Sequence, residues 1–234
     1  MQAANSECIT IGTDGSPISG IWLLPPRAAA AFVLAHGAGA GMTHPFMTRL
    51  AEGLAAQGIA TLRYQFPYME SGRRRPDPPA LCHATVRAAV AAARARCDLP
   101  LVAGGKSFGG RMTSQAQALA PLADVRGLVF VGFPLHPAGR PASERAQHLD
   151  KVGVPLLFLQ GTRDELAQIG LIESLCAELG RRAHLHRIEA ADHAFHVPAR
   201  SGRTDAEILA ELVRECARWI RALDAPAQLG GLST

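Results

Sequence analysis

The chain reads Leu101-Val102-Ala103-Gly104-Gly105-Lys106-Ser107-Phe108-Gly109-Gly110 where a short apolar segment meets a glycine-rich turn and a helical segment follows. A serine on so sharp a turn is forced towards positive φ, and glycine at both flanking positions relieves the crowding of the backbone. The turn lifts the Ser107 hydroxyl above the sheet and places the Phe108 N–H at a helix N-terminus, where it can donate to a developing oxyanion. We predict a nucleophile at Ser107; the alternative is a packing turn with an incidental serine.

Strand-like and helix-like segments alternate along the rest of the chain. We expect strands at 8–12, 18–24, 31–35, 59–64, 101–103, 127–133, 154–160 and 184–188, and helices at 46–57, 80–96, 108–119, 165–179 and 205–223. The apolar strands show no polar alternation, which indicates burial on both faces and helices on both sides of a mostly parallel sheet. The pattern predicts a doubly wound α/β fold with its site at the carboxyl ends of the strands.

The composition bounds the class of protein. The chain has 234 residues, of which 48% are hydrophobic and 19% charged, so we expect one domain over 1–234, with a flexible tail at 225–234. The longest apolar run, 28–35, is too short to span a bilayer, and the first residues lack the pattern of a secretory signal. We therefore expect a soluble cytoplasmic protein, a monomer or homodimer, without membrane contact.

Charge and cysteine content exclude two further classes. The net charge is +4, but the basic residues are almost all scattered arginines, and aromatic residues make up only 5% of the chain. This distribution does not suit a nucleic-acid surface, so we expect no nucleic-acid partner. The five cysteines are widely spaced, without a C-x-x-C pair, which argues against a disulfide framework or a zinc knuckle.

A serine hydroxyl is a poor nucleophile unless a base takes its proton and a third group orients that base. In the chain order that this turn implies, the acid comes next and a histidine last. Gly161-Thr162-Arg163-Asp164-Glu165 follows the expected strand 154–160. Asp164 is our candidate for the orienting acid, and Glu165 is the alternative.

The candidate base lies in the loop after the expected strand 184–188. His193 is our choice because a histidine there can swing over Ser107, and His196 is the competitor. His184 and His186 lie two residues apart on the strand and share a face, so we expect them to be structural.

A glycine-rich loop, His36-Gly37-Ala38-Gly39-Ala40-Gly41, follows the expected strand 31–35. It can bring a second backbone N–H, that of Ala38, towards the same oxyanion. Its spacing does not fit a dinucleotide loop, because the third glycine of G-x-G-x-x-G would fall at Met42. We expect the oxyanion hole to consist of the Ala38 and Phe108 N–H groups.

Metal-dependent hydrolysis is the other chemical class to weigh. Asp192, His193 and His196 are close in sequence, and His36 and Asp164 could join them. The chain has no H-E-x-x-H motif and no carboxylate-rich cluster, so we predict no metal and no cofactor.

The order of the glycine loop, Gly-Lys-Ser-Phe-Gly-Gly, Gly-Thr-Arg-Asp-Glu and Asp-His-Ala-Phe resembles the α/β-hydrolase superfamily over about 31 to 223. More narrowly, the stretches 64–74 and 132–137 are similar to the dienelactone-hydrolase-like branch, in the subgroup that includes a subunit of the non-specific-lethal chromatin complex. The resemblance implies a hydrolase with Ser107, Asp164 and His193 as its triad. Dienelactone hydrolases proper use a cysteine nucleophile, so the lactone substrate is not carried over.

The predicted substrate is a small ester or thioester. The segment between Phe133 and Val154 is too short for a large lid domain, so loops should form the pocket walls. Candidate substrate-binding residues, which could hold a polar or anionic group, are Tyr68, Arg73, Arg111 and His136. Because some relatives in the subgroup act as scaffolds, a non-catalytic interaction module is the first alternative to a serine hydrolase, and a metal-dependent hydrolase is the second.

Overall fold

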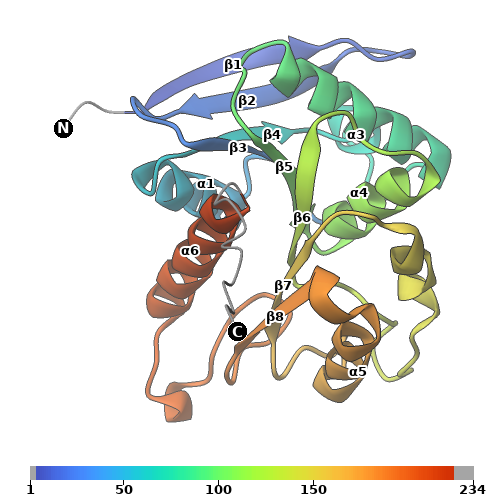
Figure 1. Ribbon diagram of the computed structural model, residues 1–234, viewed down its shortest axis with the longest axis vertical. Helices are drawn as coiled ribbons and strands as arrows, with labels where there is room; N and C mark the ends of the chain where they lie inside the picture. The colour runs from blue at the N-terminus through green and yellow to red at the C-terminus, as the bar shows by residue number, and fades with distance from the viewer. Residues whose placement is uncertain (1–3, 224–234) are drawn as a thin grey trace, which may run out of the picture.

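The computed structural model describes residues 4–223, in which the strands form one eight-stranded sheet (Figure 1). The order across the sheet is β1-β2-β4-β3-β5-β6-β7-β8. The strands are β1 (Asn5–Ile11), β2 (Ile18–Leu24), β3 (Ala30–Ala35), β4 (Ile59–Tyr64), β5 (Leu101–Lys106), β6 (Val125–Val131), β7 (Leu156–Gly161) and β8 (Ala183–Ile188). Strand β2 is antiparallel to β1 and β4, whereas the other neighbours are parallel. The predicted mostly parallel, doubly wound sheet is confirmed, and the predicted tail at 225–234 lies outside the described residues.

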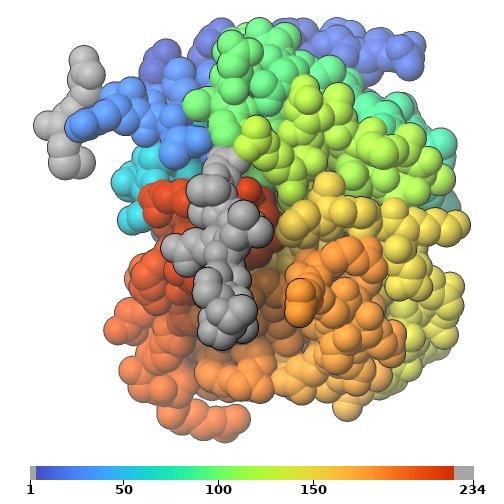
Figure 2. All heavy atoms as spheres, in the orientation of Figure 1, coloured from blue at the N-terminus to red at the C-terminus, as the bar shows by residue number. Residues whose placement is uncertain are grey.

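Helices cover both faces of this sheet. Helices α1 (Pro45–Ala56) and α6 (Asp205–Ala222) lie on one face, and α3 (Pro79–Arg94), α4 (Phe108–Leu119) and α5 (Ile169–Leu179) lie on the other (Figure 1). The shorter helices are α2 (Pro67–Glu70) and the 3-10 helices η1 (Glu144–Lys151), η2 (Gly180–Arg182) and η3 (Ala199–Ser201). In the space-filling view the N-terminal strands lie at one end of the molecule and α5 lies towards the other (Figure 2). This arrangement confirms the expected helical layers.

Strand β3 shows why an unbroken apolar run was the right signal for a central strand. All six of its residues are buried, and they alternate between the two faces. Ala31, Val33 and Ala35 pack with the α3, α4 and α5 side. Phe32 and Leu34 pack with the α1 and α6 side. A strand covered twice has no face left for polar residues.

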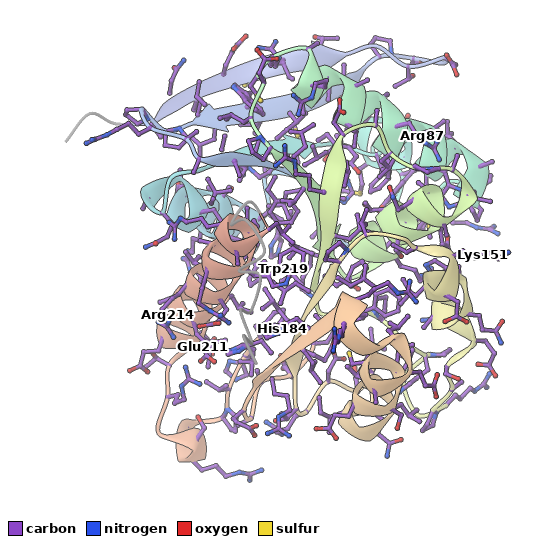
Figure 3. All side chains as sticks on the ribbon, viewed as in Figure 1. Arg87, Lys151, His184, Glu211, Arg214 and Trp219 are labelled. Atoms are coloured by element: carbon purple, nitrogen blue, oxygen red, sulfur yellow. The ribbon has the colours of Figure 1, made fainter. Side chains whose placement is uncertain are left out.

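Helix α6 closes its face of the sheet with an amphipathic pattern. Thr204 and Glu207 form a reciprocal capping box at its N-terminus, which satisfies two of the free backbone donors there. Trp219 is buried on the side of α6 towards the sheet, whereas Arg214 lies on the exposed side (Figure 3). Two predicted structural histidines lie under this helix on β8, and His186 Nε2 lies 2.7 Å from a carboxylate oxygen of Glu211.

Two predicted segments differ from the structure. The helix expected at 165–179 begins only at Ile169, because the Asp164 carboxylate accepts the Leu166 N–H at 2.8 Å and holds that stretch as a turn. The stretch between the strand expected at 59–64 and the helix expected at 80–96 contains α2, whose first position is Pro67, where the fixed φ of proline favours a helix start. Between β6 and β7 the chain forms only η1, so the predicted lack of a large lid domain is confirmed. No helix within residues 4–223 has the length and apolar character needed to cross a bilayer.

Candidate active site

Ser107 occupies the tight turn between β5 and α4 in a conformation that few non-glycine residues adopt. Its φ is 51° and its ψ is −116°, and such a strained backbone persists only where the surroundings enforce it. The neighbouring glycines explain how the turn is accommodated. A Cβ atom on Gly105 would lie 2.3 Å from the Ala35 carbonyl oxygen, and one on Gly109 would lie 2.5 Å from the His36 carbonyl oxygen. Both positions therefore require glycine because α4 and β5 press directly against β3.

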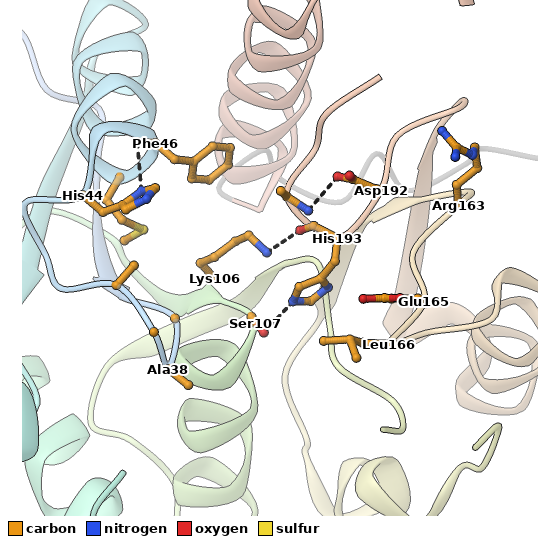
Figure 4. A pocket seen from close by; sticks show the side chains of 15 residues that line it. Ala38, His44, Phe46, Lys106, Ser107, Arg163, Glu165, Leu166, Asp192 and His193 are labelled. Atoms are coloured by element: carbon orange, nitrogen blue, oxygen red, sulfur yellow. Dashed lines mark hydrogen bonds between the residues drawn. The ribbon is translucent and has the colours of Figure 1, made fainter. Parts of the chain in front are cut away.

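The structure brings together the three residues of the predicted triad. His193 Nε2 lies 2.8 Å from Ser107 Oγ (Figure 4), and His193 Nδ1 lies 2.7 Å from Asp164 Oδ2. The Asp164 side chain is 1% exposed and that of His193 is 22% exposed. The acid is therefore shielded from water, while His193 is partly exposed and lines the same cavity as Ser107. Such an arrangement allows a histidine to take the serine proton while the carboxylate holds the ring.

Asp164 is fixed by more than the histidine. Its Oδ2 also accepts a hydrogen bond from Gln160 Nε2 at 2.6 Å, and its Oδ1 accepts one from the Leu166 N–H. Gln160 in turn accepts the Phe133 N–H through Oε1 at 2.9 Å. The carboxylate thus has a single orientation before substrate arrives. Gln160 was missed at the sequence level, because a buried glutamine at the end of an apolar strand carries no signal of its partner.

The competing acid and base lie elsewhere. Glu165 is exposed and lines a cavity beside the triad, but Asp164 holds the imidazole. His196 is exposed, and its Nδ1 contacts the Asp205 carboxylate at 2.9 Å. That carboxylate raises the pKa of His196 above its ordinary value, first through the hydrogen bond and then through charge. His193, rather than His196, is the histidine in contact with Ser107.

The glycine loop after β3 is held against the serine turn. A Cβ atom on Gly37 would lie 3.9 Å from Ser107 Cβ. The Ala38 carbonyl oxygen accepts the Tyr68 hydroxyl at 2.9 Å, which fixes the peptide that follows the glycine. Within residues 4–223 neither the Ala38 N–H nor the Phe108 N–H donates to a protein acceptor. Two free donors beside a serine are what an oxyanion hole requires.

His36 holds the glycine loop in place through two hydrogen bonds. Its ring accepts the Phe66 N–H at Nε2, 3.0 Å away, so Nδ1 carries the proton and donates to the Gly37 carbonyl at 2.8 Å. The ring is fully buried, and burial lowers the pKa of His36 to about 4, against a smaller opposing effect of the Gly37 hydrogen bond. His36 is therefore uncharged at neutral pH, and its two hydrogen bonds hold the glycine loop in place.

Ser107 opens onto two cavities. The larger, of about 720 Å³, is lined by the glycine loop, α1 and the loop of His193 (Figure 4). The smaller, of about 440 Å³, lies over the first turns of α4 and is lined by Phe108, Arg111 and Arg145 among others. Ala38, Ser107 and Leu166 belong to both linings. Ser107 therefore borders both cavities.

The candidate substrate-binding residues fall into different places. Arg111 lines the smaller cavity beside Ser107. Tyr68 is buried behind the glycine loop. Arg73 is bound to Asp77 at 2.7 Å and lies outside both linings. His136 is buried and bridges Pro137 and Gln168, at 2.9 Å from each. The Tyr68 hydroxyl and the His136 ring hold loops, and of the four candidates Arg111 is the one that lines a cavity beside Ser107; direct substrate contact stays a prediction.

Lys106 has a role that was not predicted. Its Nζ donates to the His193 carbonyl at 2.7 Å (Figure 4) and lies 5.3 Å from the centre of the Phe195 ring. Burial lowers the pKa of Lys106 to about 8, although the Asp164 and Asp192 carboxylates oppose this effect. Lys106 thus ties the serine turn to the histidine loop. The lysine beside the serine was visible in sequence, but its partner is 87 residues away.

The residues that were considered as metal ligands are bound to other groups of the protein. His36 is committed to Gly37 and Phe66, and His196 is paired with Asp205. Asp192 Oδ1 accepts the Ala194 N–H at 2.8 Å. Among residues 4–223, no three His, Cys, Asp or Glu side chains are grouped so that they could hold a metal ion.

Comparison with known proteins identifies one matching family and many similar folds. A family described as an alpha/beta hydrolase domain matches residues 28–221. A dienelactone hydrolase from Anabaena variabilis aligns with a TM-score of 0.74 and 19% identity, over 94% of this chain and 99% of that one. A serine hydrolase without a lid from Xanthomonas campestris aligns with a TM-score of 0.71 and 23% identity, over 92% and 95% of the two chains.

A third similar structure is a dienelactone hydrolase-like promiscuous phosphotriesterase from metagenomic libraries. It aligns with a TM-score of 0.72 and 18% identity, over 95% of this chain and 99% of that one. At these identities the three structures establish a shared fold. The chemistry of this chain has to be argued from its own residues.

Proposed function

The chain belongs to the alpha/beta hydrolase family, and we propose that it is a serine hydrolase that cleaves a small ester or thioester through an acyl-enzyme on Ser107. One observation carries the proposal. The strained serine of the turn lies 2.8 Å from His193 Nε2, and the opposite ring nitrogen lies 2.7 Å from the buried Asp164 carboxylate. A serine in this setting has both a base and an orienting acid within hydrogen-bond reach.

The first half of the reaction forms the acyl-enzyme. Ser107 Oγ attacks the carbonyl carbon while His193 Nε2 takes the hydroxyl proton, and Asp164 stabilises the imidazolium that results. The N–H groups of Ala38 and Phe108 donate to the oxyanion of the tetrahedral intermediate. As the intermediate collapses, the bond to the leaving oxygen or sulfur breaks, and His193 gives its proton to the leaving group.

The second half releases the acid. A water molecule occupies the place of the leaving group, gives a proton to His193 and forms a bond to the acyl carbon. The bond to Ser107 Oγ then breaks and the serine regains its proton. No cofactor is needed in either half, because the chain itself supplies nucleophile, base and oxyanion donors.

The narrower placement of the chain is also part of the proposal. The motifs at 64–74 and 132–137 support a place in the dienelactone-hydrolase-like branch, in the subgroup that includes the non-specific-lethal complex subunit. The continuous sheet supports a single domain over 1–234. From composition alone we propose a cytoplasmic monomer or homodimer.

A fluorophosphonate probe tests the function, because it labels only a serine that is activated as a nucleophile. We expect the wild-type chain to be labelled, Ser107→Ala to be unlabelled, and the matched control Ser174→Ala, which changes an exposed serine on α5, to be labelled like the wild type. Hydrolysis of short 4-nitrophenyl esters should follow the same order.

Two outcomes would favour the alternatives. A wild-type chain that reacts no faster than Ser107→Ala would support a non-catalytic interaction module. Ester hydrolysis that survives Ser107→Ala and is lost on addition of a chelator would support a metal-dependent hydrolase.

A further inference from the structure

The two cavities beside Ser107 have distinct chemical roles, provided that the proposed function holds. In the tetrahedral intermediate the carbon carries the serine oxygen, the oxyanion, the leaving atom and the acyl group. His193 must protonate the leaving atom, so the leaving group has to lie on the side of His193. His193 lines the larger cavity and is not part of the lining of the smaller one. The leaving group therefore occupies the larger cavity, and the acyl group extends into the smaller one.

The smaller cavity carries two arginines from separate elements. Arg111 lies on the first turn of α4, and Arg145 lies at the start of η1. Both are partly buried. The two elements are held together by Ser114 of α4, whose Oγ lies 2.7 Å from His148 Nε2 of η1. The arginine pair is therefore built into the packing of α4 against η1.

Neither guanidinium group has an acidic partner in the part of the chain that the structure describes. Within residues 4–223 no ion pair joins Arg111 or Arg145 to a carboxylate. Asp77, which lines the same cavity, is occupied by Arg73 at 2.7 Å and by the Tyr68 N–H at 2.7 Å. The Nε atom of Arg111 is buried and has no hydrogen-bond partner among these residues. A buried donor without a partner is costly, and such a group is commonly found where a ligand completes its bonds.

The pKa shifts around Arg111 and Arg145 agree with an excess of positive charge in the smaller cavity. Burial lowers the pKa of Arg111 below its ordinary value, and the neighbouring Arg145 lowers it further. Burial also lowers the pKa of His148 to about 4, and the Arg111 and His83 side chains lower it in the same direction. Two like charges held near each other and partly out of water are unfavourable until an anion lies between them.

We propose that the acyl group of the substrate ends in a carboxylate, which Arg111 and Arg145 bind together in the smaller cavity. The substrate is then the monoester or monothioester of a short dicarboxylic acid, with the neutral part as its leaving group. Ser107 Oγ bonds to the acyl carbon as the bond to the leaving atom breaks, and water then breaks the serine ester. The products are a dicarboxylate and a neutral alcohol or thiol.

The test compares two esters that differ only at the far end of the acyl chain. Monomethyl glutarate carries the carboxylate, and methyl glutaramate replaces it with a neutral amide of similar size; the succinate and adipate pairs vary the chain length. The readout is the ratio of kcat/KM for the anionic ester to that for the neutral ester, measured by proton release. We expect a ratio of roughly tenfold to a hundredfold in favour of the anion at the best length, since the contacts are charge-assisted hydrogen bonds.

Four variants test where the carboxylate of the substrate binds. Arg111→Gln and Arg145→Gln should each lower the ratio about tenfold, because kcat/KM should fall more for the anionic ester than for the neutral one. Arg163→Gln removes an arginine from the larger cavity and should not change the ratio. Arg140→Gln removes the same charge from an exposed position outside both linings and controls for net charge.

Each outcome decides one of the two proposals. A ratio near one at every chain length, or a ratio that falls with Arg163→Gln and not with Arg111→Gln or Arg145→Gln, overturns the carboxylate subsite. Fluorophosphonate labelling of Ser107 with no hydrolysis of any anionic ester also overturns it and leaves the nucleophile intact. Failure of the labelling itself overturns the proposed function instead.

Discussion

Replacement of His36 by glutamine should remove a large part of the acid sensitivity of this fold. The imidazole is fully buried beneath the glycine loop and accepts the Phe66 N–H at Nε2, so it stays neutral in the folded chain down to about pH 4. In the unfolded chain the same group takes a proton near its ordinary pKa of 6.5. Between these two values the unfolded chain binds more protons, so stability falls as the pH falls. A glutamine at this position does not titrate.

The expected size follows from the two pKa values. The shift from 6.5 to about 4 corresponds to roughly 3 kcal/mol of stability lost once the pH is below both values. Between pH 7.5 and pH 5.0 the same linkage gives a loss of about 2 kcal/mol, because nearly all unfolded chains are protonated at pH 5.0 and few folded ones are. Below about pH 4 both states carry the proton, and His36 causes no further loss.

Urea unfolding at the two pH values measures this loss directly. The wild type and His36→Gln are compared by the change in unfolding free energy between pH 7.5 and 5.0, so that a lower stability of the variant at both pH values cancels. The change should be smaller in His36→Gln by about 2 kcal/mol. His196→Gln is the control, because that imidazole is exposed and its pKa is raised by Asp205, so its replacement should not reduce the loss. An equal loss in the wild type and His36→Gln would refute the reasoning.

Three further predictions concern the turn and the triad. Lys106→Met removes the donor that binds the His193 carbonyl, so kcat on a neutral ester should fall about tenfold with little change in KM. Lys106→Arg keeps a donor and should restore most of the activity; an unchanged kcat in Lys106→Met would show that this contact does not position the histidine. Gly109→Ala puts a methyl group 2.5 Å from the His36 carbonyl oxygen and should lower the free energy of unfolding in urea by about 1–3 kcal/mol. The control Gly170→Ala, with open space around it, should not lower it. Equal effects of the two substitutions would show that the turn at Gly109 has room for a Cβ. Asp164→Asn should lower kcat on a neutral ester by about 10³ to 10⁴ without loss of the folded near-UV signal, and a smaller loss would mean that another group orients the base.

Much of the fold was readable from local patterns. Unbroken apolar runs such as 30–35 identified strands covered on both faces, because burial on both sides leaves no polar positions. Ser107 between Gly105 and Gly109 could be identified as a tight turn from the local pattern of residues, although the atoms that leave no room for a Cβ at either glycine belong to Ala35 and His36. Asp164 and His193 followed from their places after successive strands, because the carboxyl ends of parallel strands meet at one edge.

Other features depend on side-chain contacts that the sequence pattern does not indicate. Asp164 was preferred to Glu165 from its place after the strand, but the contacts of its carboxylate with Gln160 and Leu166 are visible only in the structure. Tyr68 was predicted to touch substrate, but its hydroxyl is directed to a loop 30 residues earlier in the chain. The start of α5 was wrong by one turn because a single carboxylate held the preceding residues in a turn.

The serine turn and the arginine pair differ most in how far the sequence alone could predict them. The glycines and the serine at 105–109 are adjacent in sequence, so the motif could be identified without the structure, although the atoms that exclude a Cβ at Gly105 and Gly109 lie in Ala35 and His36. Arg111 and Arg145 are two of many scattered arginines, and nothing adjacent to either marks it as unpaired. Their proximity arises when α4 packs against η1, while Asp77, which shares their cavity, is bound to Arg73. The charge around a group is set by what folding brings near it in space.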